Sequence, residues 1–246
     1  MADRYFVDSP IKGGSATLTG PEAHHLARVM RAGLGTEVVL FDGSGAEFAA
    51  RVDRVERNEV HLTIVSGGPV DRELPRAVTL GVSLPKGDRQ KWLVEKAVEL
   101  GVKRIVPLRT ARSVAQPSHQ ALARLGRTVI EASKQCGRNR LLGLAEAQAW
   151  VDFAHSAPSP SCRLLAHPGI QATAPSGAAP STSRAGRHHS DEVYLAIGPE
   201  GGFTPEEVGV ALAAGWQPVD LGPRILRVET AAIFLTALVI SRGRME

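Results

Sequence analysis

The stretch that decides the fold is Val193-Tyr194-Leu195-Ala196-Ile197-Gly198-Pro199-Glu200-Gly201-Gly202, an apolar run that ends in a glycine-rich turn. Such a run predicts a buried strand, and the following Thr204-Pro205-Glu206-Glu207 carries the signals of a helix start. A second turn, at 222–227, leaves a predicted strand at 218–221 and enters an apolar helix near Thr230. Glycine turns after two adjacent strands predict one ligand crevice, because ligands of open parallel sheets bind there. The alternative is that both are ordinary strand-to-helix turns.

Length and composition describe an ordinary globular chain. Its 246 residues, 43% hydrophobic and 22% charged, suffice for one large or two modest domains. The N-terminus lacks the apolar core of a signal peptide, and the longest apolar run, 231–240, is too short to cross a bilayer. Cys136 and Cys162 are far apart and form no metal-type pair. We therefore expect a cytoplasmic protein with free thiols, no metal site and no membrane association.

The charge is concentrated in the middle of the chain. Residues 86–140 carry 13 Lys and Arg against 4 Asp and Glu, a local net charge of +9, although the whole chain has only +4. Residues 1–70 carry 7 basic and 9 acidic residues, a net charge of −2. A local excess of positive charge favours a polyanionic partner, and nucleic acid is the first candidate. A solvated basic surface is the alternative.

The pattern of expected elements changes near residue 70. Residues 1–70 alternate short strands with turns and include a helix from Pro21 to about Arg31, which predicts a small β-rich, barrel-like domain. Residues 76–246 alternate strands with helices, which predicts a parallel α/β sheet. The Ala-, Pro-, Ser- and Gly-rich stretch 169–190 predicts a flexible insertion. Its pair His188-His189 lacks a second cluster of metal ligands.

Three groups of polar residues are candidates for RNA contacts. A phosphate at the helix start near 86–91 would use both free N–H groups and cations. The group at 138–140 follows another helix, where pairing with the helix dipole is the alternative. The third group lies beside His24-His25 on the N-terminal helix, where simple exposure is the alternative. The predicted RNA-contacting residues are Arg28, Arg31, Lys86, Arg89, Arg138 and Asn139.

Four motifs occur in a fixed order along the chain. They are Lys86-Gly87-Asp88-Arg89, Glu131-Ala132-Ser133-Lys134-Gln135-Cys136-Gly137-Arg138-Asn139, Ile197 to Phe203, and Leu221-Gly222-Pro223-Arg224-Ile225-Leu226-Arg227-Val228-Glu229-Thr230-Ala231. Together they resemble the RsmE family, the ribosomal RNA small subunit methyltransferases E. The resemblance extends over nearly the whole chain and includes Arg4-Tyr5-Phe6 and Leu40-Phe41-Asp42-Gly43.

The resemblance implies a fold and a reaction. The fold would be α/β, with a SPOUT-type parallel sheet and C-terminal trefoil knot at 76–246 and a PUA-like RNA-binding β-barrel at 1–70. The knot is implied by the family alone. The protein would be a homodimer, and the apolar helix 231–240 independently predicts a subunit interface. It would transfer a methyl group from S-adenosyl-L-methionine to N3 of one uridine in 16S ribosomal RNA of the small subunit.

The resemblance also implies a cofactor pocket built from three loops, 166–168, 198–202 and 221–226. Uridine N3 must lose a proton before it attacks, so Glu200 or Glu229 is expected to act as general base, and Arg227 to stabilise a uracil carbonyl. Structural pairing is the alternative for each carboxylate. The predicted cofactor-binding residues are His167, Leu195, Ile197, Gly198, Glu200, Gly201, Gly202, Leu221, Gly222, Ile225 and Leu226.

Two other functions are compatible with a basic α/β chain. The first is a knotted methyltransferase that acts on transfer RNA. The second is a non-catalytic RNA-binding factor of ribosome assembly, which would not need the two glycine turns. A nucleotide-phosphate enzyme is disfavoured because the sequence contains no Gly-x-x-x-x-Gly-Lys-Ser/Thr loop.

Overall fold

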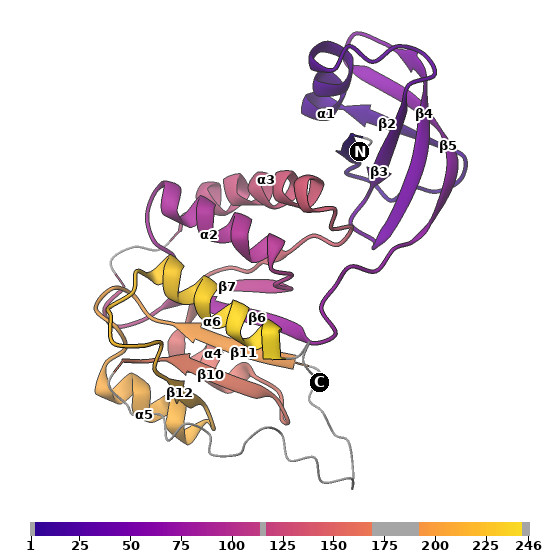
Figure 1. The fold of residues 1–246 in the computed structure, drawn as a ribbon. Helices are drawn as coiled ribbons and strands as arrows, with labels where there is room; N and C mark the ends of the chain where they lie inside the picture. Colours follow the sequence, from indigo (N-terminus) through magenta and orange to yellow (C-terminus); the bar gives the residue numbers. More distant parts are fainter. Residues whose placement is uncertain (1–2, 114–116, 169–191, 243–246) are drawn as a thin grey trace, which may run out of the picture. The chain divides into compact units, whose positions relative to one another are not determined.

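The computed structural model describes residues 3–113, 117–168 and 192–242 (Figure 1). The chain divides into two compact units. Unit 1 comprises Met1–Glu73 and Ile130–Leu141, and unit 2 comprises Leu74–Val129 and Leu142–Glu246. The return of 130–141 to the first unit is not apparent in the sequence. The predicted insertion at 169–190, with His188-His189, lies outside the described residues.

Unit 1 contains a five-stranded sheet, one short helical segment and the C-terminal part of a long helix, α3 (His119–Cys136). The strand order is β1-β3-β4-β5-β2, with β1 and β3 parallel and the other pairs antiparallel. Helix α1 (Gly20–His24) continues as a π-helical turn, η1 (His25–Val29), so the predicted helix 21–31 is confirmed with a change of helix type. Its core includes Tyr5, Leu18, Leu26, Leu40 and Leu62, all fully buried. The strands are β1 (Arg4–Phe6), β2 (Ser15–Thr19), β3 (Glu37–Phe41), β4 (Ala46–Val55) and β5 (Glu59–Pro69).

Unit 2 contains a parallel sheet, as the alternation of strands and helices predicts. The strand order is β12-β10-β11-β6-β7-β8, and β9 also pairs with β7. The strands are β6 (Ala77–Val82), β7 (Arg104–Arg109), β8 (Gly143–Leu144), β9 (Gln148–Ala149), β10 (Cys162–Ala166), β11 (Glu192–Ile197) and β12 (Gln217–Val219). The helices that follow them are α2 (Asp88–Glu99), α3 (His119–Cys136), α4 (Trp150–Ser156), α5 (Pro205–Ala213) and α6 (Val228–Arg242).

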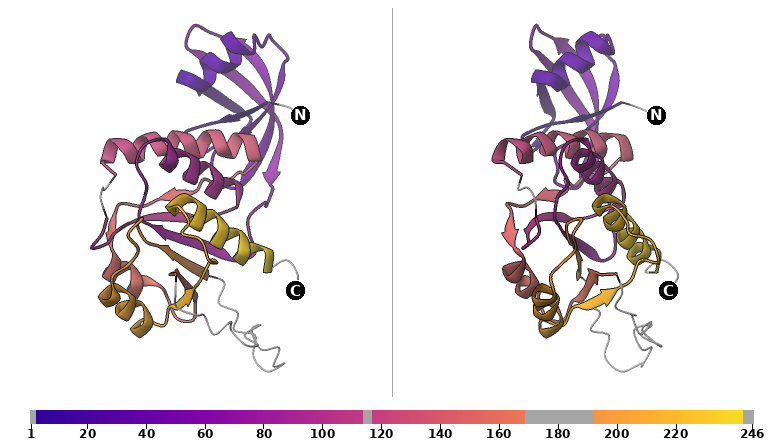
Figure 2. Two further views of the ribbon diagram at one scale, coloured as in Figure 1. Left: turned by 60° about the vertical axis from the view of Figure 1, so that its left-hand side comes forward. Right: turned by 90° about the vertical axis from the view of Figure 1, so that its left-hand side faces the viewer.

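Helices cover both faces of this parallel sheet (Figure 2). Helix α6 packs on β6 and β11 beside α2, whereas α4 and α5 pack together over the opposite face. An aromatic cluster of Trp150, Phe153, Phe203 and Trp216 lies on the side of the sheet that α4 and α5 cover. The ring centres of Trp150 and Phe203 are 4.6 Å apart. The indole Nε1 of Trp150 donates to the carbonyl oxygen of Glu207 at 2.9 Å, so the buried N–H is satisfied. None of the helices in the described part of the chain is long and apolar enough to cross a bilayer.

One sequence-based expectation for unit 2 is wrong, and three of its elements were not foreseen. The strands that precede the two glycine turns are not adjacent, because β10 lies between β11 and β12. Among the described strands, β12 pairs only with β10, and it contains Pro218, whose missing N–H suits an edge strand. The elements β8, β9 and α4 were not expected, since the two strands are only 2 residues long each and carry no periodic signal.

Candidate active site

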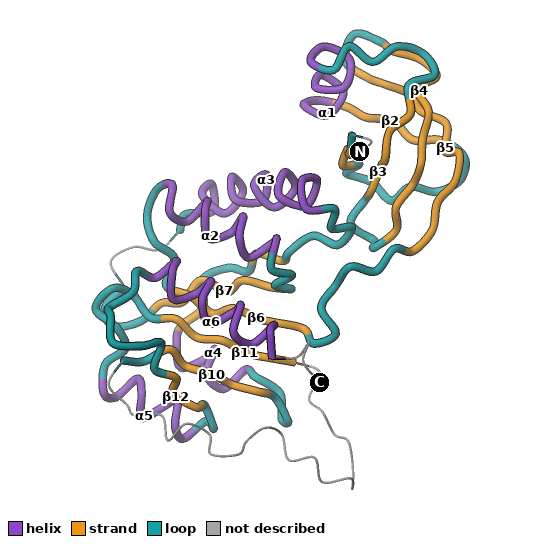
Figure 3. Tube along the Cα trace, viewed as in Figure 1, coloured by secondary structure: helices purple, strands orange, loops and turns teal. Residues whose placement is uncertain are grey.

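A cavity of about 280 Å³ lies at the carboxyl ends of β10, β11 and β12. Figure 3 shows the loops that follow these strands. Three loops and the start of α6 form its walls. Gly202 and Gly222 adopt φ angles of +69° and +108°, which a residue with a Cβ rarely adopts. The cavity is lined by Ala166, His167, Pro168, Ile197, Gly198, Pro199, Glu200, Gly201, Gly202, Asp220, Leu221, Gly222, Arg224, Ile225, Leu226, Val228 and Ala231.

Backbone and side-chain hydrogen bonds fix the loops around the cavity. The N–H of His167 donates to the carbonyl of Val219 at 3.1 Å, which joins the first loop to the end of β12, just before the third loop. The N–H of Gly202 donates to the carbonyl of Pro199 at 2.8 Å and closes the second loop as a turn. Arg112 Nη1 donates to the carbonyl of Gly201 at 2.6 Å, so a side chain from another loop supports the same turn. These bonds hold the walls in place before any ligand enters.

The helix that follows the second loop begins as the sequence predicts. Thr204 Oγ1 accepts from the N–H of Glu207 at 3.3 Å, and Glu207 Oε2 accepts from the N–H of Thr204 at 2.9 Å. This capping box satisfies two N–H groups that the helix itself leaves free. It also fixes the direction in which the chain leaves the cavity.

The structure brings together ten of the eleven residues predicted to bind a cofactor. Leu195 is the exception: it is fully buried in the middle of β11 and does not line the cavity. Only the last residue of a strand and the turn after it reach the carboxyl edge of the sheet. Val228 and Ala231 were missed because α6 begins at Val228, two residues earlier than predicted. The ten are His167, Ile197, Gly198, Glu200, Gly201, Gly202, Leu221, Gly222, Ile225 and Leu226.

The two candidate bases lie near one cation. Arg89 Nη1 donates to Glu200 Oε1 at 3.3 Å and is 3.9 Å from Glu229 Oε2. Glu200 lines the cavity, whereas Glu229 lies in the first turn of α6 and is only 6% exposed. Glu229 Oε2 is buried and has no hydrogen-bond partner among the described residues. Arg227 is exposed and does not line the cavity.

The predicted RNA contacts divide into exposed and buried groups. Lys86 is exposed and Arg89 is 42% exposed beside the N-terminus of α2, whose N-cap, Gly87, provides no side-chain hydrogen bond. Arg28 and Arg31 are exposed in unit 1. These four side chains remain available to a polyanion.

The prediction of direct RNA contacts by Arg138 and Asn139 is wrong, because these residues are only 4% and 2% exposed. Arg138 donates from Nε and Nη2 to the two oxygens of Glu73 at 2.9 and 2.5 Å. Asn139 Nδ2 donates to the carbonyl of Val70 at 3.2 Å. Both residues therefore stabilise unit 1 from within.

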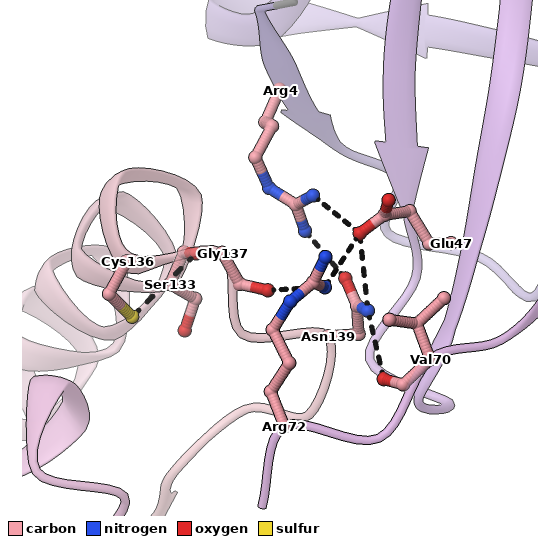
Figure 4. Close-up of polar contacts among 8 residues, drawn as sticks. All are labelled: Arg4, Glu47, Val70, Arg72, Ser133, Cys136, Gly137 and Asn139. Atoms are coloured by element: carbon pink, nitrogen blue, oxygen red, sulfur yellow. Dashed lines mark hydrogen bonds and ion pairs between the residues drawn. The ribbon is translucent and has the colours of Figure 1, made fainter. Parts of the chain in front are cut away.

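Glu47 is the centre of the polar cluster that surrounds Asn139 (Figure 4). Its Oε2 accepts from Arg4 Nη1 at 2.7 Å and from Arg72 Nη1 at 2.8 Å. Burial alone raises the pKa of Glu47, but the hydrogen bonds from Arg72 and Arg4 outweigh it and lower that pKa to about 2. Arg4 Nη2 also donates to Asn139 Oδ1 at 2.5 Å. The cluster ties the segment after α3 to strands β1 and β4.

One further group of potential metal ligands lies in the β4–β5 hairpin. Ligand atoms of Glu56, Glu59 and His61 are all within 4.8 Å of one another. Arg54 Nη2 is 2.9 Å from Glu56 Oε1, so part of this acidic charge is already paired. The group belongs to unit 1, whereas the cavity residues belong to unit 2.

Comparison with known proteins defines the class first. A family model described as an RNA methyltransferase domain matches residues 72–240, and one described as an RNA methyltransferase PUA domain matches residues 18–65. The fold is thus that of an RNA methyltransferase with a parallel α/β sheet and a PUA-like N-terminal domain.

Individual relatives then define the family. The ribosomal RNA small subunit methyltransferase E of Synechocystis sp. is 33% identical over 88% of this chain and 70% of its own. The Bacillus subtilis protein of that name is 28% identical over 91% of this chain and 88% of its own. A crystal structure of the Neisseria gonorrhoeae ribosomal RNA small subunit methyltransferase E, bound to S-adenosyl methionine, matches with 30% identity and a TM-score of 0.85 over 98% of both chains. The chain belongs to the ribosomal RNA small subunit methyltransferase E family.

Proposed function

We propose that this protein is an S-adenosyl-L-methionine-dependent methyltransferase that modifies N3 of a uridine in 16S ribosomal RNA of the small subunit. The observation that carries the proposal is the cavity at the carboxyl ends of β10, β11 and β12, lined by ten of the residues expected to bind the cofactor. Its position is the usual ligand site of an open parallel sheet. The names of the relatives support the RNA substrate, and the Neisseria structure supports the cofactor.

The cavity suits the cofactor chemically. Ile197, Leu221 and Leu226 offer apolar walls for an adenine ring, and the glycines of the second loop expose backbone groups for its polar edge. Glu200 and Asp220 add negative charge for a cationic ligand. When bound, the cofactor supplies an activated methyl group, so the chain's own residues need only orient the uridine and remove a proton.

Proton removal is the step that this chain must assist. The N3–H bond of uridine breaks, the proton passes to a carboxylate, and the N3 electron pair becomes available to the methyl carbon. Glu229 and Glu200 are the candidates, and the buried Oε2 of Glu229, which accepts no hydrogen bond from the described residues, favours that residue. Arg227 would stabilise the negative charge that develops on a uracil carbonyl oxygen.

The catalytic proposal predicts large losses at saturating cofactor. Replacing the true base by its amide, in Glu229→Gln or Glu200→Gln, is expected to lower kcat by about 10²–10⁴-fold. Arg227→Ala is expected to lower kcat by about 10²–10³-fold, as for loss of one oxyanion donor. Methyl transfer to small subunits from cells lacking this gene would be measured, and calorimetric cofactor binding would be the control. Wild-type rates for all three variants would exclude these roles.

The substrate can be tested directly. Ribosomal RNA from cells that lack the gene is expected to lose one methylated uridine, which mass spectrometry would detect. Methylation of transfer RNA in place of small-subunit particles would contradict the proposed substrate. It would leave the cofactor site intact.

We propose the finer architecture on the same family basis. Residues 1–70 would be the PUA-like RNA-binding domain and residues 76–246 a SPOUT domain with a C-terminal trefoil knot, in a cytoplasmic homodimer. Trp92 on α2 and Phe234 on α6 are 44% and 43% exposed, and these two helices are neighbours, which supports an apolar interface there. A monodisperse monomer in light scattering at micromolar concentration would contradict the dimer.

A further inference from the structure

In the described part of unit 2, Arg89 pairs with two carboxylates, Glu200 in the wall of the cavity and Glu229 in the first turn of α6. Its Nη1 is 3.3 Å from Glu200 Oε1 and 3.9 Å from Glu229 Oε2. One guanidinium group therefore compensates two negative charges. Among these three groups the net charge is −1 when all are ionised.

The two carboxylates hold Arg89 with unequal strength. The Glu200 side chain is 54% exposed, so water can replace Arg89 there at little cost. The Glu229 side chain is 8% exposed, and its Oε2 has no hydrogen-bond partner among the described residues. Removal of the cation from Glu229 would leave a buried charge without compensation, which is costly. Arg89 is therefore expected to exchange its contact with Glu200 and to stay near Glu229.

Glu200 and Arg89 can each contact a different ligand, the first in the cavity and the second at the start of α2. Glu200 lines the cavity, so a cationic ligand there would compete with Arg89 for the carboxylate. Arg89 is itself 42% exposed at the start of α2, three residues after the exposed Lys86. A guanidinium group has five N–H donors, so Arg89 can stay close to Glu229 and still offer donors to a phosphate.

We propose that Arg89 is a positioning residue that couples a cationic cofactor in the cavity to RNA bound at the start of α2. This inference rests on the proposed function. A positive charge beside Glu200 releases Arg89 from that carboxylate and makes its N–H donors available to an RNA phosphate. Loss of the methyl group removes that charge, so Glu200 recovers Arg89 and the hold on RNA weakens. Because coupling is reciprocal, bound RNA strengthens cofactor binding by the same factor.

The test compares two non-reacting cofactor analogues that differ in charge. Sinefungin carries an amino group in place of the sulfonium, whereas S-adenosylhomocysteine has a neutral sulfur. The Kd of a 16S ribosomal RNA transcript would be measured with each analogue at saturation. The wild-type protein is expected to bind the transcript about two- to fivefold more tightly with sinefungin, the range of a partly exposed ion pair.

Glu200→Gln provides the most specific variant. It is expected to reduce the Kd ratio to about one and to tighten RNA binding with S-adenosylhomocysteine, because Arg89 is then released permanently. Glu206→Gln is the matched control, since Glu206 is exposed near the same turn and has no ion pair with Arg89 among the described residues. This control should retain the wild-type ratio.

Arg89→Gln should also reduce the ratio to about one, whereas Lys91→Gln, which removes a cation from the same helical turn, should retain it. A wild-type ratio of one, or a ratio that persists in Glu200→Gln, would overturn the coupling. Calorimetry separates this failure from that of the proposed function. Sinefungin binding with a ratio of one overturns the coupling alone, whereas no sinefungin binding overturns both.

Discussion

Two polar clusters look alike in the sequence and differ in the structure. Residues 86–89 lie at the start of α2 in unit 2, and residues 138–139 follow α3 in unit 1. Lys86 is exposed and Arg89 is 42% exposed, whereas Arg138 and Asn139 are 4% and 2% exposed. Basic composition beside a helix end therefore does not by itself identify a surface for RNA.

The difference arises from where the acidic partners lie. Arg138 forms a bidentate ion pair with Glu73, which is 65 residues away in the sequence. Arg89 pairs with Glu200, at a separation of 111 residues, but this carboxylate lines a cavity and is itself exposed. The first pair is closed and structural, and the second is open to exchange with a ligand.

The largest effect is expected from Arg138→Ala. The substitution leaves Glu73 without its buried partner, so the free energy of unfolding should fall by about 3–5 kcal/mol. Urea denaturation followed by circular dichroism would measure this change. Arg140→Ala is the control, because Arg140 is exposed and its loss should cost less than about 0.5 kcal/mol. If both substitutions lowered the free energy of unfolding equally, the buried Arg138–Glu73 pair would contribute no more to stability than an exposed arginine.

A smaller effect is expected from acid. The pKa of Glu47 is lowered from 4.5 to about 2 in the folded protein, so the folded state favours the carboxylate. Its stabilisation is complete above pH 4.5 and is lost as the pH falls towards 2, because the unfolded chain takes up the proton first. We expect a loss of roughly 2 kcal/mol, since partial exposure reduces the full linkage value.

Acid denaturation of two variants isolates this contribution. Glu47→Gln should flatten the fall in stability between pH 4.5 and 2, whereas Glu37→Gln should not. Glu37 also pairs with an arginine, Arg51, at 3.3 Å, but its side chain is 73% exposed. The same pH profile in both variants and in the wild type would show that the Glu47 cluster does not control acid stability.

The smallest effect on stability is expected at Lys86. Lys86→Gln should change the free energy of unfolding by less than about 0.5 kcal/mol, because the side chain is exposed. It should weaken binding of 16S ribosomal RNA about two- to tenfold and reduce the slope of log K against log salt by about one. Filter binding at several salt concentrations would measure both. Lys103→Gln removes an exposed cation just before β7 and should leave the affinity unchanged.

Local signals in the sequence predicted much of the fold. The capping box at Thr204 and Glu207, and the buried strand that ends at Ile197, depend on residues close together in the chain. The order of the strands depends on segments that are distant in the sequence, because β10 pairs on one side with β11 and on the other with β12. Local signals therefore could not predict it. For the same reason Glu73 and Glu47 could not be recognised as the partners that bury Arg138 and surround Asn139.

In the candidate site, too, features set by neighbouring residues were predicted and contacts between distant residues were not. Ten of the eleven expected cofactor residues belong to the cavity because turns after parallel strands share one edge of the sheet. Leu195 was misplaced because an apolar residue within a strand and one at its end look identical in a pattern of hydrophobicity. The approach of Arg89 to both Glu200 and Glu229 joins three distant positions and could be seen only in the structure.

The return of residues 130–141 to unit 1 has a consequence during translation. When Glu73 has just been synthesised, the chain still lacks the arginine that will neutralise it and the asparagine that will join Arg4 to Val70. At about 5–20 residues per second, the ribosome needs roughly 3–14 seconds more to reach Leu141. The polar contacts of the amino-terminal unit are therefore completed only after residues 74–129 of the second unit have been made. A nascent chain cut before that point carries Glu73 without its arginine partner.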